Sequence, residues 1–412
     1  MRESKQPTHR LMIVAGEASG DTLAASLVHS LREQDANRDF EFFGATGEKM
    51  RAAGVEEIVR TDHLSITGIA GIGRALPLFW RVFQTLKCTA LARRPDAVIL
   101  VDWPDFNLRL ARALHRRGLK VIYYVSPQLW AWRAHRIRNM RRDVDLLLSI
   151  LPFESAWYNA RGLSHVEFVG HPLVGTLGTQ TTRAEFCLRN NLTPEHPVIA
   201  LLPGSRRKEL TRNLPLMLDA AQILLRTQPN AQFTLALAPN RSREEAAEIV
   251  ATIDTDSTPT ESTSTADTPQ LIERLRIIEG ATYDALAAAN AAAVTSGTAT
   301  LEAALIGTPL VVVYKESALN WHTLGRLIDT EHFGLVNLIA GKRIATELMQ
   351  NDFTGARLAD ELIVLLDTER NRRARLQLRE AVARLGAGGA SKRAADTIIH
   401  ALHNWNANEK IF

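Results

Sequence analysis

Short apolar runs alternate with helical patterns along almost all of this 412-residue chain. Most runs are four to six residues long, which is the length of a strand, and stretches with helical spacing separate them. Strands that alternate with helices form parallel sheets from βαβ units, so the sequence predicts an α/β fold. The expected strands are Leu11–Ala15, Phe40–Gly44, Ala97–Val101, Val121–Val125, Leu146–Ile150, Glu167–Val169, Val198–Leu202, Gln232–Leu237, Leu275–Ile278, Ala291–Val294 and Leu310–Tyr314.

The chain is too long for a single sheet of this kind. One hydrophobic core stops growing at roughly 250–300 residues, so two domains are expected. Gly and Pro interrupt the pattern at Gly170-His171-Pro172. The segment Leu358–Leu402 has helical spacing throughout and predicts helices without strands. Residues 252–268 are rich in Ser, Thr and Asp and predict a flexible surface insert. We expect an N-terminal domain over residues 1–175, a second domain over 176–355 and C-terminal helices over 356–412.

Composition and charge exclude several classes of protein. The net charge of +4 and the pI of about 9.2 favour anionic ligands or a membrane surface, but fall short of a nucleic-acid-binding surface. Cys88 and Cys187 lie in no motif, which predicts buried thiols in a reducing cytoplasm. No segment resembles a signal peptide or approaches the roughly 20 apolar residues that span a bilayer. A cytoplasmic protein, with or without contact to a membrane surface, is therefore expected.

No metal site is expected from the sequence. The twelve histidines form no HExxH motif and no Cys/His cluster. Asp143 and Asp145 spell the DxD of metal-using sugar transferases, but they lead into a strand and have no supporting ligand set.

The stretch Val198–Leu210 predicts a phosphate-binding turn. A buried strand runs into Pro203-Gly204-Ser205, and Arg206-Arg207-Lys208 falls in the expected first turn of a helix. Helix N-termini offer unpaired backbone N–H groups and a positive dipole end, and an arginine adds a planar fork for phosphate. Gly204, Ser205 and Arg206 are therefore expected to bind phosphate. The alternative is an ordinary strand–turn–helix junction whose basic side chains are only solvated.

Ligands of open α/β sheets bind beyond the carboxyl ends of the strands. The segment Gly16–Asp21 follows the first strand, and its small residues let a ligand approach the backbone. Its spacing is not GxGxxG, so a substrate-binding loop with Glu17, Ser19 and Asp21 is better supported than a dinucleotide site. A tight turn in which Ser19 or Asp21 caps the next helix is the alternative.

Two carboxylates and an amide follow the strand Ala97–Val101, at Asp102, Asp105 and Asn107. Such groups are costly beside an apolar core unless they have partners or a function. Asp102 comes directly after the strand and is expected to act as a general base, with a pKa that its neighbours raise. Asp105 or Asn107 is expected to cap the next helix.

Aromatic and basic residues follow the strand Val121–Val125. Trp130 and Trp132 precede a basic run that contains Arg133, Arg136, Arg138, Arg141 and Arg142. An exposed tryptophan here would stack on a sugar ring or lie at a lipid interface. A solvated basic helix with a tryptophan in the core is the alternative.

The turn Ser296-Gly297-Thr298 also opens a helix directly after a strand. Its small residues suit a second phosphate contact, and Glu302, one turn later, would accept hydrogen bonds from a ribose diol.

One segment points to membranes. Leu64–Phe83 is apolar and rich in glycine, although Arg74 and Arg81 exclude a comfortable span. An interfacial helix that also receives acyl chains fits this pattern, and packing between the two domains is the alternative.

These motifs occur together in one known family. They are VAGEASGD at 14–21, DWPDFN at 102–107, YVSPQLWAWR at 124–133, LPFE at 151–154, GHPL at 170–173, LLPGSR at 201–206, SGTATLE at 296–302 and LVNLIAG at 335–341, with Glu347 and Gln350 beyond. In this order the chain closely resembles the lipid-A-disaccharide synthases over nearly its whole length. Any one motif is weak, but the combination is highly specific.

The resemblance implies a GT-B fold, in which two Rossmann-like domains face each other across a cleft that holds the active site. It implies an inverting, metal-independent glycosyltransferase without a cofactor. The donor would be UDP-2,3-diacylglucosamine and the acceptor 2,3-diacylglucosamine 1-phosphate, giving the β-1,6 lipid A disaccharide 1-phosphate and UDP. A homodimer on the inner face of the cytoplasmic membrane of a Gram-negative bacterium is also implied.

Residue by residue, the resemblance makes Asp102 the base, Arg206 the diphosphate-binding arginine and Asn337 a residue of the donor site. The matching motifs add further residues around the donor and the substrate cleft, namely Glu17, Ser19, Asp21, Trp132, Ser296, Gly297, Thr298 and Glu302. The chain departs from the family at Val174-Gly175, in the insert 252–268 and in residues 66–72. The last departure would affect how the acceptor or its acyl chains are handled.

Other functions stay open at this point. The first alternative is another GT-B UDP-sugar transferase that acts on a lipid-linked cell-wall precursor. A membrane-associated protein that binds nucleotide sugars without turnover is the second. A nicotinamide-dependent oxidoreductase is disfavoured because the dinucleotide fingerprint is missing.

Overall fold

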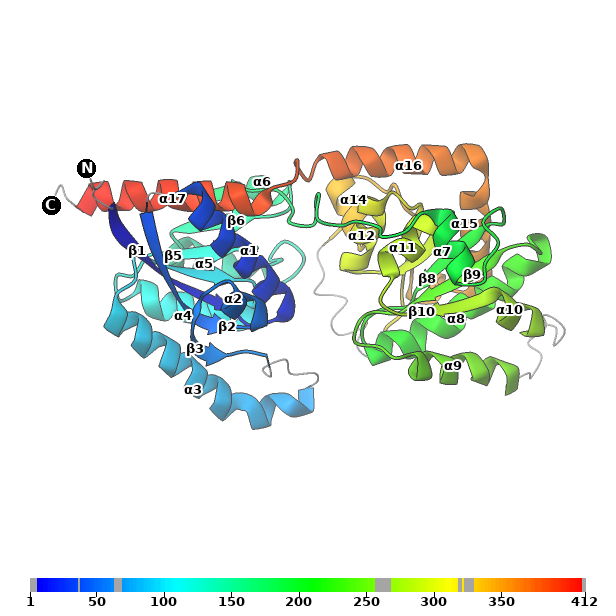
Figure 1. Cartoon of the computed structure of the whole chain (residues 1–412), viewed down its shortest axis with the longest axis horizontal. Coiled ribbons are helices and arrows are strands. Elements are labelled where there is room, and N and C mark those ends of the chain that lie inside the picture. The colour runs from blue at the N-terminus through cyan, green and yellow to red at the C-terminus, as the bar shows by residue number, and fades with distance from the viewer. Residues whose placement is uncertain are drawn as a thin grey trace. The chain divides into compact units, whose positions relative to one another are not determined.

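The computed structural model describes residues 6–35, 38–62, 69–255, 268–317, 321 and 330–409. Within it the chain forms two α/β units (Figure 1). Unit 1 comprises residues 1–174 and 385–412, and unit 2 comprises residues 175–384. The chain therefore leaves unit 1 once and returns to it near its end.

Unit 1 is built on a seven-stranded parallel sheet of order β3-β2-β1-β4-β5-β6-β7. The strands are β1 (Gln6–Ala15), β2 (Arg38–Thr46), β3 (Glu56–Arg60), β4 (Ala97–Val101), β5 (Val121–Tyr124), β6 (Leu146–Ser149) and β7 (Val166–Phe168). The helices are α1 (Ala18–Gln34), α2 (Glu48–Ala52), α3 (Ile69–Arg93), α4 (Pro104–His115), α5 (Ile137–Asp143), α6 (Glu154–Asn159) and α17 (Ala390–Glu409), with a 3₁₀ turn at Ala134–Arg136.

Unit 2 is built on a six-stranded parallel sheet of order β10-β9-β8-β11-β12-β13. The strands are β8 (Val198–Leu202), β9 (Gln232–Ala236), β10 (Leu275–Ile278), β11 (Ala291–Thr295), β12 (Leu310–Tyr314) and β13 (Glu347–Met349). The helices are α7 (Arg183–Arg189), α8 (Arg207–Thr227), α9 (Arg243–Thr255), α10 (Thr268–Arg274), α11 (Thr282–Ala288), α12 (Thr298–Ile306), α14 (Leu335–Ala340), α15 (Gly355–Leu366) and α16 (Thr368–Ala383), with a 3₁₀ turn at Gln350–Asp352.

Helices cover both faces of each sheet, which explains why the strands are continuous apolar runs rather than alternating ones. In β1, Leu11 and Ile13 pack against α1 and α17 on one face. Met12 and Val14, which point the other way, pack against α3 and α4. The same division holds in unit 2, where α8 and α15 cover one face of β8 and α7, α11 and α12 cover the other.

The eleven strands expected from the sequence are all present, with ends that differ by a few residues. Strands β3 and β13 were not expected. Strand β3 has the sequence EEIVR and lies at the edge of its sheet, so it lacks an apolar run. Strand β13 has only three residues and lies at the edge of the other sheet.

The C-terminal helices do not stay together as the expected group 356–412. Helices α15 and α16 belong to unit 2, whereas α17 packs against α1 of unit 1. The buried stripe of α17 consists of Ala394, Ala395, Ile398 and Leu402. The boundary between the units along the chain falls after Val174, next to the expected Gly175.

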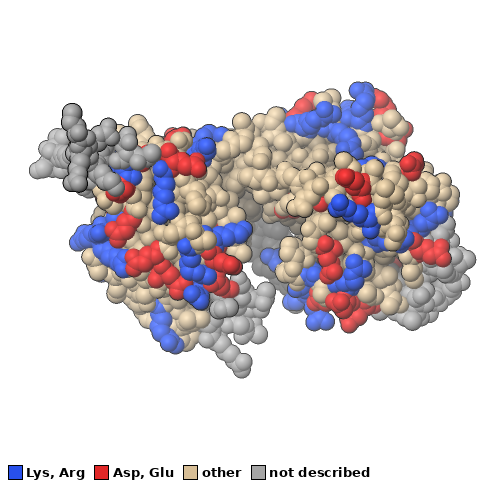
Figure 2. All heavy atoms as spheres, viewed as in Figure 1, with Lys and Arg blue, Asp and Glu red and all other residues tan. Residues whose placement is uncertain are grey.

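Four expectations, on the cysteines, two segments of the chain, the surface charge and membrane-spanning helices, have different outcomes. Cys187 is buried as expected, but Cys88 is exposed, so the expectation of two buried thiols was wrong. Most of the insert 252–268, and the side chains of the loop 66–72, lie outside the described residues. Lys and Arg are interspersed with Asp and Glu on the face of each unit seen in Figure 2, without a single basic field there. No helix among the described residues is long and apolar enough to cross a membrane.

Candidate active site

The strand order of each sheet indicates where ligands bind. In unit 1 the order reverses direction between β1 and β4, and in unit 2 it reverses between β8 and β11. Such switch points leave a crevice at the carboxyl ends of the two strands, which is where open α/β sheets bind ligands. The loops at these ends begin at Gly16, Asp102, Pro203 and Ser296, and all four were singled out from the sequence.

Asp102 lies at the switch point of unit 1, and its main chain is held firmly. Asp102 and Trp103 both have left-handed backbones, with φ of 50° and 51°. The Asp102 carbonyl accepts hydrogen bonds from the Tyr123 hydroxyl at 2.7 Å and from Asn107 Nδ2 at 2.8 Å. Non-glycine residues in this region are strained and persist only where the surroundings impose the conformation, which is common at functional sites.

The surroundings of Asp102 suit a general base. Burial, together with the negative charge of Glu17, raises the pKa of Asp102, and a hydrogen bond from the Trp103 backbone acts against this rise. A raised pKa makes a carboxylate a better proton acceptor. Gly16 is needed beside it, because a Cβ at that position would overlap the Trp103 indole. The structure thus brings Gly16 and Glu17 of the first loop together with Asp102.

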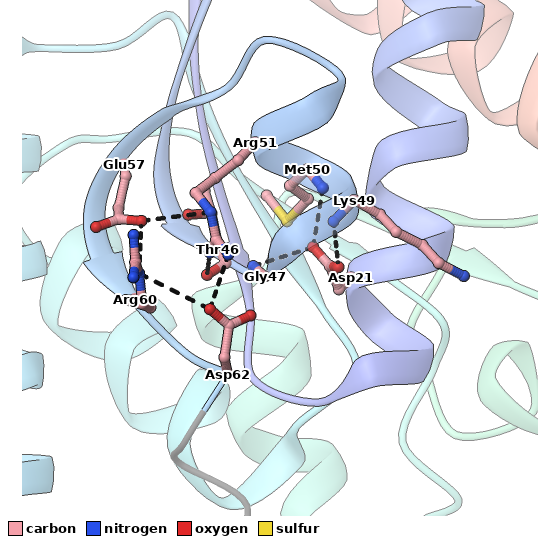
Figure 3. Close-up of polar contacts among 9 residues, drawn as sticks. All are labelled: Asp21, Thr46, Gly47, Lys49, Met50, Arg51, Glu57, Arg60 and Asp62. Carbon is pink, nitrogen blue, oxygen red and sulfur yellow. Dashed lines mark hydrogen bonds and ion pairs between the residues drawn. The ribbon is translucent and has the colours of Figure 1, made fainter. Parts of the chain in front are cut away.

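Asp21 does not belong to this crevice, although it was expected there. Its buried carboxylate accepts hydrogen bonds from the backbone N–H groups of Gly47 (3.0 Å), Lys49 (2.9 Å) and Met50 (3.0 Å) at the start of α2 (Figure 3). Asp21 is therefore a cap for a helix other than its own. Ser19 is exposed in the first turn of α1, and no side chain caps that helix.

Asp105 and Asn107 do not cap α4, contrary to expectation. The N-cap position of α4 is Trp103, and no side chain caps it. Asn107 supports the Asp102 carbonyl instead. Asp105 forms ion pairs with Arg133 (3.0 Å) and Arg136 (2.7 Å), which follow β5.

The two tryptophans of the β5 loop differ in environment. Trp130 is buried and donates its Nε1–H to Glu154 at 3.0 Å, as in the core alternative. Trp132 is 41% exposed, and the Arg133 guanidinium lies over its ring at 4.0 Å. Trp132 is therefore partly exposed, with Arg133 against its ring.

Unit 2 contains a cavity of about 800 Å³ at its own switch point. Residues that follow β8, β9, β10 and β11 line it, together with part of α7. Seven of the residues expected at the donor site are among them, namely Gly204, Ser205, Arg206, Ser296, Gly297, Thr298 and Glu302. A cavity of this size and place matches the general description of a cofactor-sized binding site.

Arg206 lies just before α8 rather than inside its first turn. Its side chain is exposed and only loosely paired with Glu209, at 3.3 Å. The Glu209 carboxylate also accepts the backbone N–H groups of Ser205 (3.0 Å) and Arg206 (3.1 Å). This carboxylate, which was not expected from the sequence, satisfies two of the backbone N–H groups that were expected to bind phosphate. What Arg206 itself offers a ligand is its side chain.

The N-terminus of α12, the second helix that begins at this cavity, is better suited to bind an anion than the N-terminus of α8. The N-cap of α12 is Gly297, which has no side chain to cap the helix. Gly297 and Thr298 are both exposed, so their N–H groups can reach a ligand. Ser296 is held in place because its hydroxyl donates to the Phe333 carbonyl at 2.9 Å. The positive end of α12 thus opens into the cavity.

Glu302 and Tyr283 form a pair in the same cavity. Burial raises the pKa of Glu302, and a hydrogen bond from the Tyr283 hydroxyl acts against this rise. Tyr283 comes from the start of α11 after β10 and was not expected at the site from the sequence. Its position shortly after an expected strand was the one available signal.

Asn337 does not line the cavity and is fully buried, contrary to its assignment to the donor site. Its amide donates to the Ala345 carbonyl and to Glu347, both at 2.8 Å, and its oxygen accepts two backbone N–H groups. Glu347 also accepts the N–H of Phe333, whose carbonyl binds Ser296. Asn337 therefore supports the cavity wall from behind.

The described residues contain no cluster of metal-binding side chains. Within the part of the chain that the structure describes, no group of three or more His, Cys, Asp or Glu side chains could hold a metal ion. Asp143 pairs with Arg142, and Asp145 pairs with His115 and Lys120, so the DxD residues serve ion pairs.

Solved structures with the same fold define the class of protein. The chain aligns with a putative UDP-N-acetylglucosamine 2-epimerase from Listeria monocytogenes with a TM-score of 0.62 and 16% identity, covering 96% of this chain and 97% of the other. It aligns with the calicheamicin glycosyltransferase CalG4 with a TM-score of 0.54 and 15% identity, covering 98% and 99%. Two Rossmann-like units in one chain, each with a switch-point site, make this a GT-B fold.

Sequence comparison identifies the particular family. A family model described as lipid-A-disaccharide synthetase matches residues 11–399. The lipid-A-disaccharide synthase of Trichlorobacter lovleyi is 39% identical over 391 residues, which is 95% of this chain and 97% of the relative. That of Syntrophus aciditrophicus is 41% identical over 386 residues, covering 93% and 96%. The chain belongs to the lipid-A-disaccharide synthase family and is a glycosyltransferase.

Proposed function

We propose that the enzyme transfers 2,3-diacylglucosamine from UDP-2,3-diacylglucosamine to the 6-hydroxyl of 2,3-diacylglucosamine 1-phosphate. The oxygen of that hydroxyl bonds to the anomeric carbon of the donor, with inversion, as the bond from this carbon to the diphosphate breaks. The products are the β-1,6 disaccharide 1-phosphate and UDP. Family membership supports the reaction, and the unit 2 cavity is the observation that carries the donor half of the mechanism.

The donor nucleotide binds in the unit 2 cavity. The exposed Arg206 guanidinium and the uncapped N-terminus of α12 at Gly297 and Thr298 approach the diphosphate. As the bond breaks, negative charge grows on the leaving diphosphate, and these fixed positive groups stabilise it without a metal or a cofactor. Glu302, which is held by Tyr283, accepts hydrogen bonds from the ribose diol.

The acceptor hydroxyl is deprotonated by Asp102. Its raised pKa and its rigid main chain support this role, because a base must be both basic enough and correctly placed. The proton passes from the 6-hydroxyl to the Asp102 carboxylate as the new glycosidic bond forms. Glu17 contributes by raising the pKa of Asp102.

The acyl chains of both substrates require contact with a membrane. Helix α3 exposes two large apolar side chains, Leu78 (45%) and Trp80 (63%). Phe79 of the same helix packs against Trp103, the neighbour of Asp102, with ring centroids 5.9 Å apart. An exposed apolar helix surface close to the base supports peripheral binding to the inner face of the cytoplasmic membrane.

Membrane binding is tested by flotation with phospholipid vesicles. Trp80→Ser is expected to weaken binding, whereas Leu376→Ser, at a 49% exposed leucine of α16, is not. Equal binding of all three proteins would contradict a role for α3. The homodimer implied by the family is tested separately by light scattering.

The reaction is tested by incubating the purified enzyme with both diacylated substrates and detecting the disaccharide and UDP by mass spectrometry. Asp102→Asn is expected to lower the rate by roughly 10²–10⁴-fold, the usual contribution of a general base. Asp62→Asn, at a carboxylate of an ion pair in the same unit, is the matched control and is expected to keep full activity.

The outcomes separate the parts of the proposal. Product from Asp102→Asn at the rate of the unchanged enzyme would remove Asp102 from its role but keep the reaction. Turnover of a non-acylated UDP-sugar alone would favour a transferase that acts on another lipid-linked acceptor. UDP binding without any product would favour the binding-only alternative.

A further inference from the structure

Two arginines share one carboxylate beside the proposed base. Arg133 Nη1 and Arg136 Nη2 both pair with Oδ1 of Asp105, at 3.0 and 2.7 Å. Within the described residues, neither guanidinium has a second ion-pair partner. Each guanidinium carries five N–H donors, so most donors of both remain available. The cluster of Asp105, Arg133 and Arg136 keeps one net positive charge and can bind an anion.

This cluster is built into the fold rather than being a loose surface group. Arg133 has a left-handed backbone with φ of 58°, and its guanidinium is stacked over Trp132. The loop that carries it is anchored from below by α6. Trp130 donates to the buried Glu154 at 3.0 Å, and the Tyr158 hydroxyl donates to the Pro127 carbonyl at 2.7 Å. The loop that carries the two arginines is therefore anchored before any ligand arrives.

The cluster lies close to Asp102. Asp105 is three residues further along the chain, in the first turn of α4, so the Cα atoms of Asp102 and Asp105 are at most about 10 Å apart. Tyr123, whose hydroxyl binds the Asp102 carbonyl, is in range of the charges of Asp102, Asp105 and Arg136. The base, after β4, and the arginine cluster, after β5, therefore lie at the same end of the sheet.

We propose that Arg133 and Arg136 bind the anomeric phosphate of the acceptor, which places its 6-hydroxyl at Asp102. This inference rests on the proposed function. Guanidinium forks match the geometry of a phosphate monoester. The 1-phosphate and the carbon that bears the 6-hydroxyl are attached to the two ring carbons that flank the ring oxygen, so one site can contact both groups. Trp132, which is 41% exposed, is available to stack on the same ring. The cluster thereby selects a phosphorylated acceptor and sets its orientation.

The experiment compares two acceptors in neutral detergent micelles without phospholipid. One is 2,3-diacylglucosamine 1-phosphate, and the other is its neutral 1-O-methyl glycoside. The quantity measured is the ratio of kcat/KM for the phosphorylated acceptor to that for the neutral one. Arg136→Gln and Arg133→Gln are each expected to lower this ratio roughly tenfold to hundredfold, which is the loss of one charged hydrogen-bonded contact. Arg136→Lys is expected to recover part of it.

The neutral acceptor is the internal control for folding. Variants that only perturb the structure would lower kcat/KM for both acceptors equally, which would overturn the proposal and leave the reaction intact. The matched control is Arg138→Gln, an exposed arginine two residues further along that does not pair with Asp105. The proposal would also be overturned if the ratio of kcat/KM values fell in Arg138→Gln and not in Arg133→Gln or Arg136→Gln.

A separate measurement distinguishes the acceptor phosphate from a lipid headgroup. Binding of Arg136→Gln to phosphatidylglycerol vesicles is expected to equal that of the unchanged enzyme. Weaker vesicle binding with an unchanged ratio would assign the cluster to the membrane and refute the phosphate subsite. If the unchanged enzyme used neither acceptor, the proposed function itself would fail.

Discussion

Replacing Asp21 by alanine tests whether this residue is structural, as its contacts indicate, or part of the substrate site. Its carboxylate accepts three backbone N–H groups at the start of α2, and two of these hydrogen bonds, from Gly47 and Met50, are buried (Figure 3). Leaving a buried donor unsatisfied costs about 1–3 kcal/mol. Two such donors, partly relieved by water and local relaxation, suggest a loss of about 2–4 kcal/mol in the free energy of unfolding.

Asp21→Asn keeps one acceptor oxygen and is expected to cost about half as much. Asp62→Asn is the control in the same region, because Asp62 forms a partly exposed ion pair with Arg51 at 2.8 Å. Such pairs contribute only about 0–1 kcal/mol. Replacing Asp21 is therefore expected to lower the free energy of unfolding much more than replacing the neighbouring Asp62 (Figure 3).

The assay is urea unfolding followed by tryptophan fluorescence. Of the seven tryptophans, only Trp321 belongs to unit 2, so the signal reports mainly on unit 1. In thermal unfolding, the loss corresponds to a Tm about 5–15 °C lower for a unit of this size. The kcat/KM of the folded Asp21→Asn protein is expected to stay within about twofold, because the carboxylate meets backbone and not substrate.

The reasoning is refuted if Asp21→Ala loses less than about 0.5 kcal/mol, the usual range of surface changes. It is also refuted if Asp21→Asn keeps its stability but loses activity. In that case the carboxylate would act on substrate, as the motif alone suggested.

Four other predictions follow from the sites. Glu17→Gln removes a negative charge that raises the pKa of Asp102. Because the base is active when it is deprotonated, the acidic limb of the profile of kcat/KM against pH should move to lower pH. Arg206→Gln should weaken UDP binding in calorimetry by roughly tenfold to hundredfold, whereas its exposed neighbour Arg207→Gln should change it little. Dialysis against EDTA should leave the transfer rate unchanged, and a lost rate restored by Mg²⁺ would contradict charge stabilisation by Arg206 and α12. Burial raises the pKa of Glu154 from 4.5 to about 7, so between these pH values the folded state binds more protons than the unfolded state. The free energy of unfolding should therefore fall as the pH rises from about 5 to 7. This fall should disappear in Glu154→Gln.

Much of the fold followed from local pattern. The strands at the centre of each sheet are buried on both faces by helices, so each had to be an apolar run that can be read without a structure. Edge strands β3 and β13 escape this rule because one is polar and the other is very short. The positions of Asp102, Arg206 and Ser296 after central strands were predictable for the same reason, and parallel sheets favour ligand sites at those ends.

Only the tertiary structure decided what the polar residues of those loops contact. Asp21 stands in a recognisable motif, yet its carboxylate satisfies backbone groups of another helix, 26 to 29 residues further along the chain. Asn337 also stands in a motif, but it holds the loop that follows its own helix. Tyr283 carries no motif, but folding brings it to Glu302 from a different helix. The sequence also does not say that α17 returns to unit 1, because its apolar stripe would fit any complementary surface. Local sequence determines which segments form strands and helices, whereas hydrogen-bond partners distant in the chain exist only once the sheets have assembled.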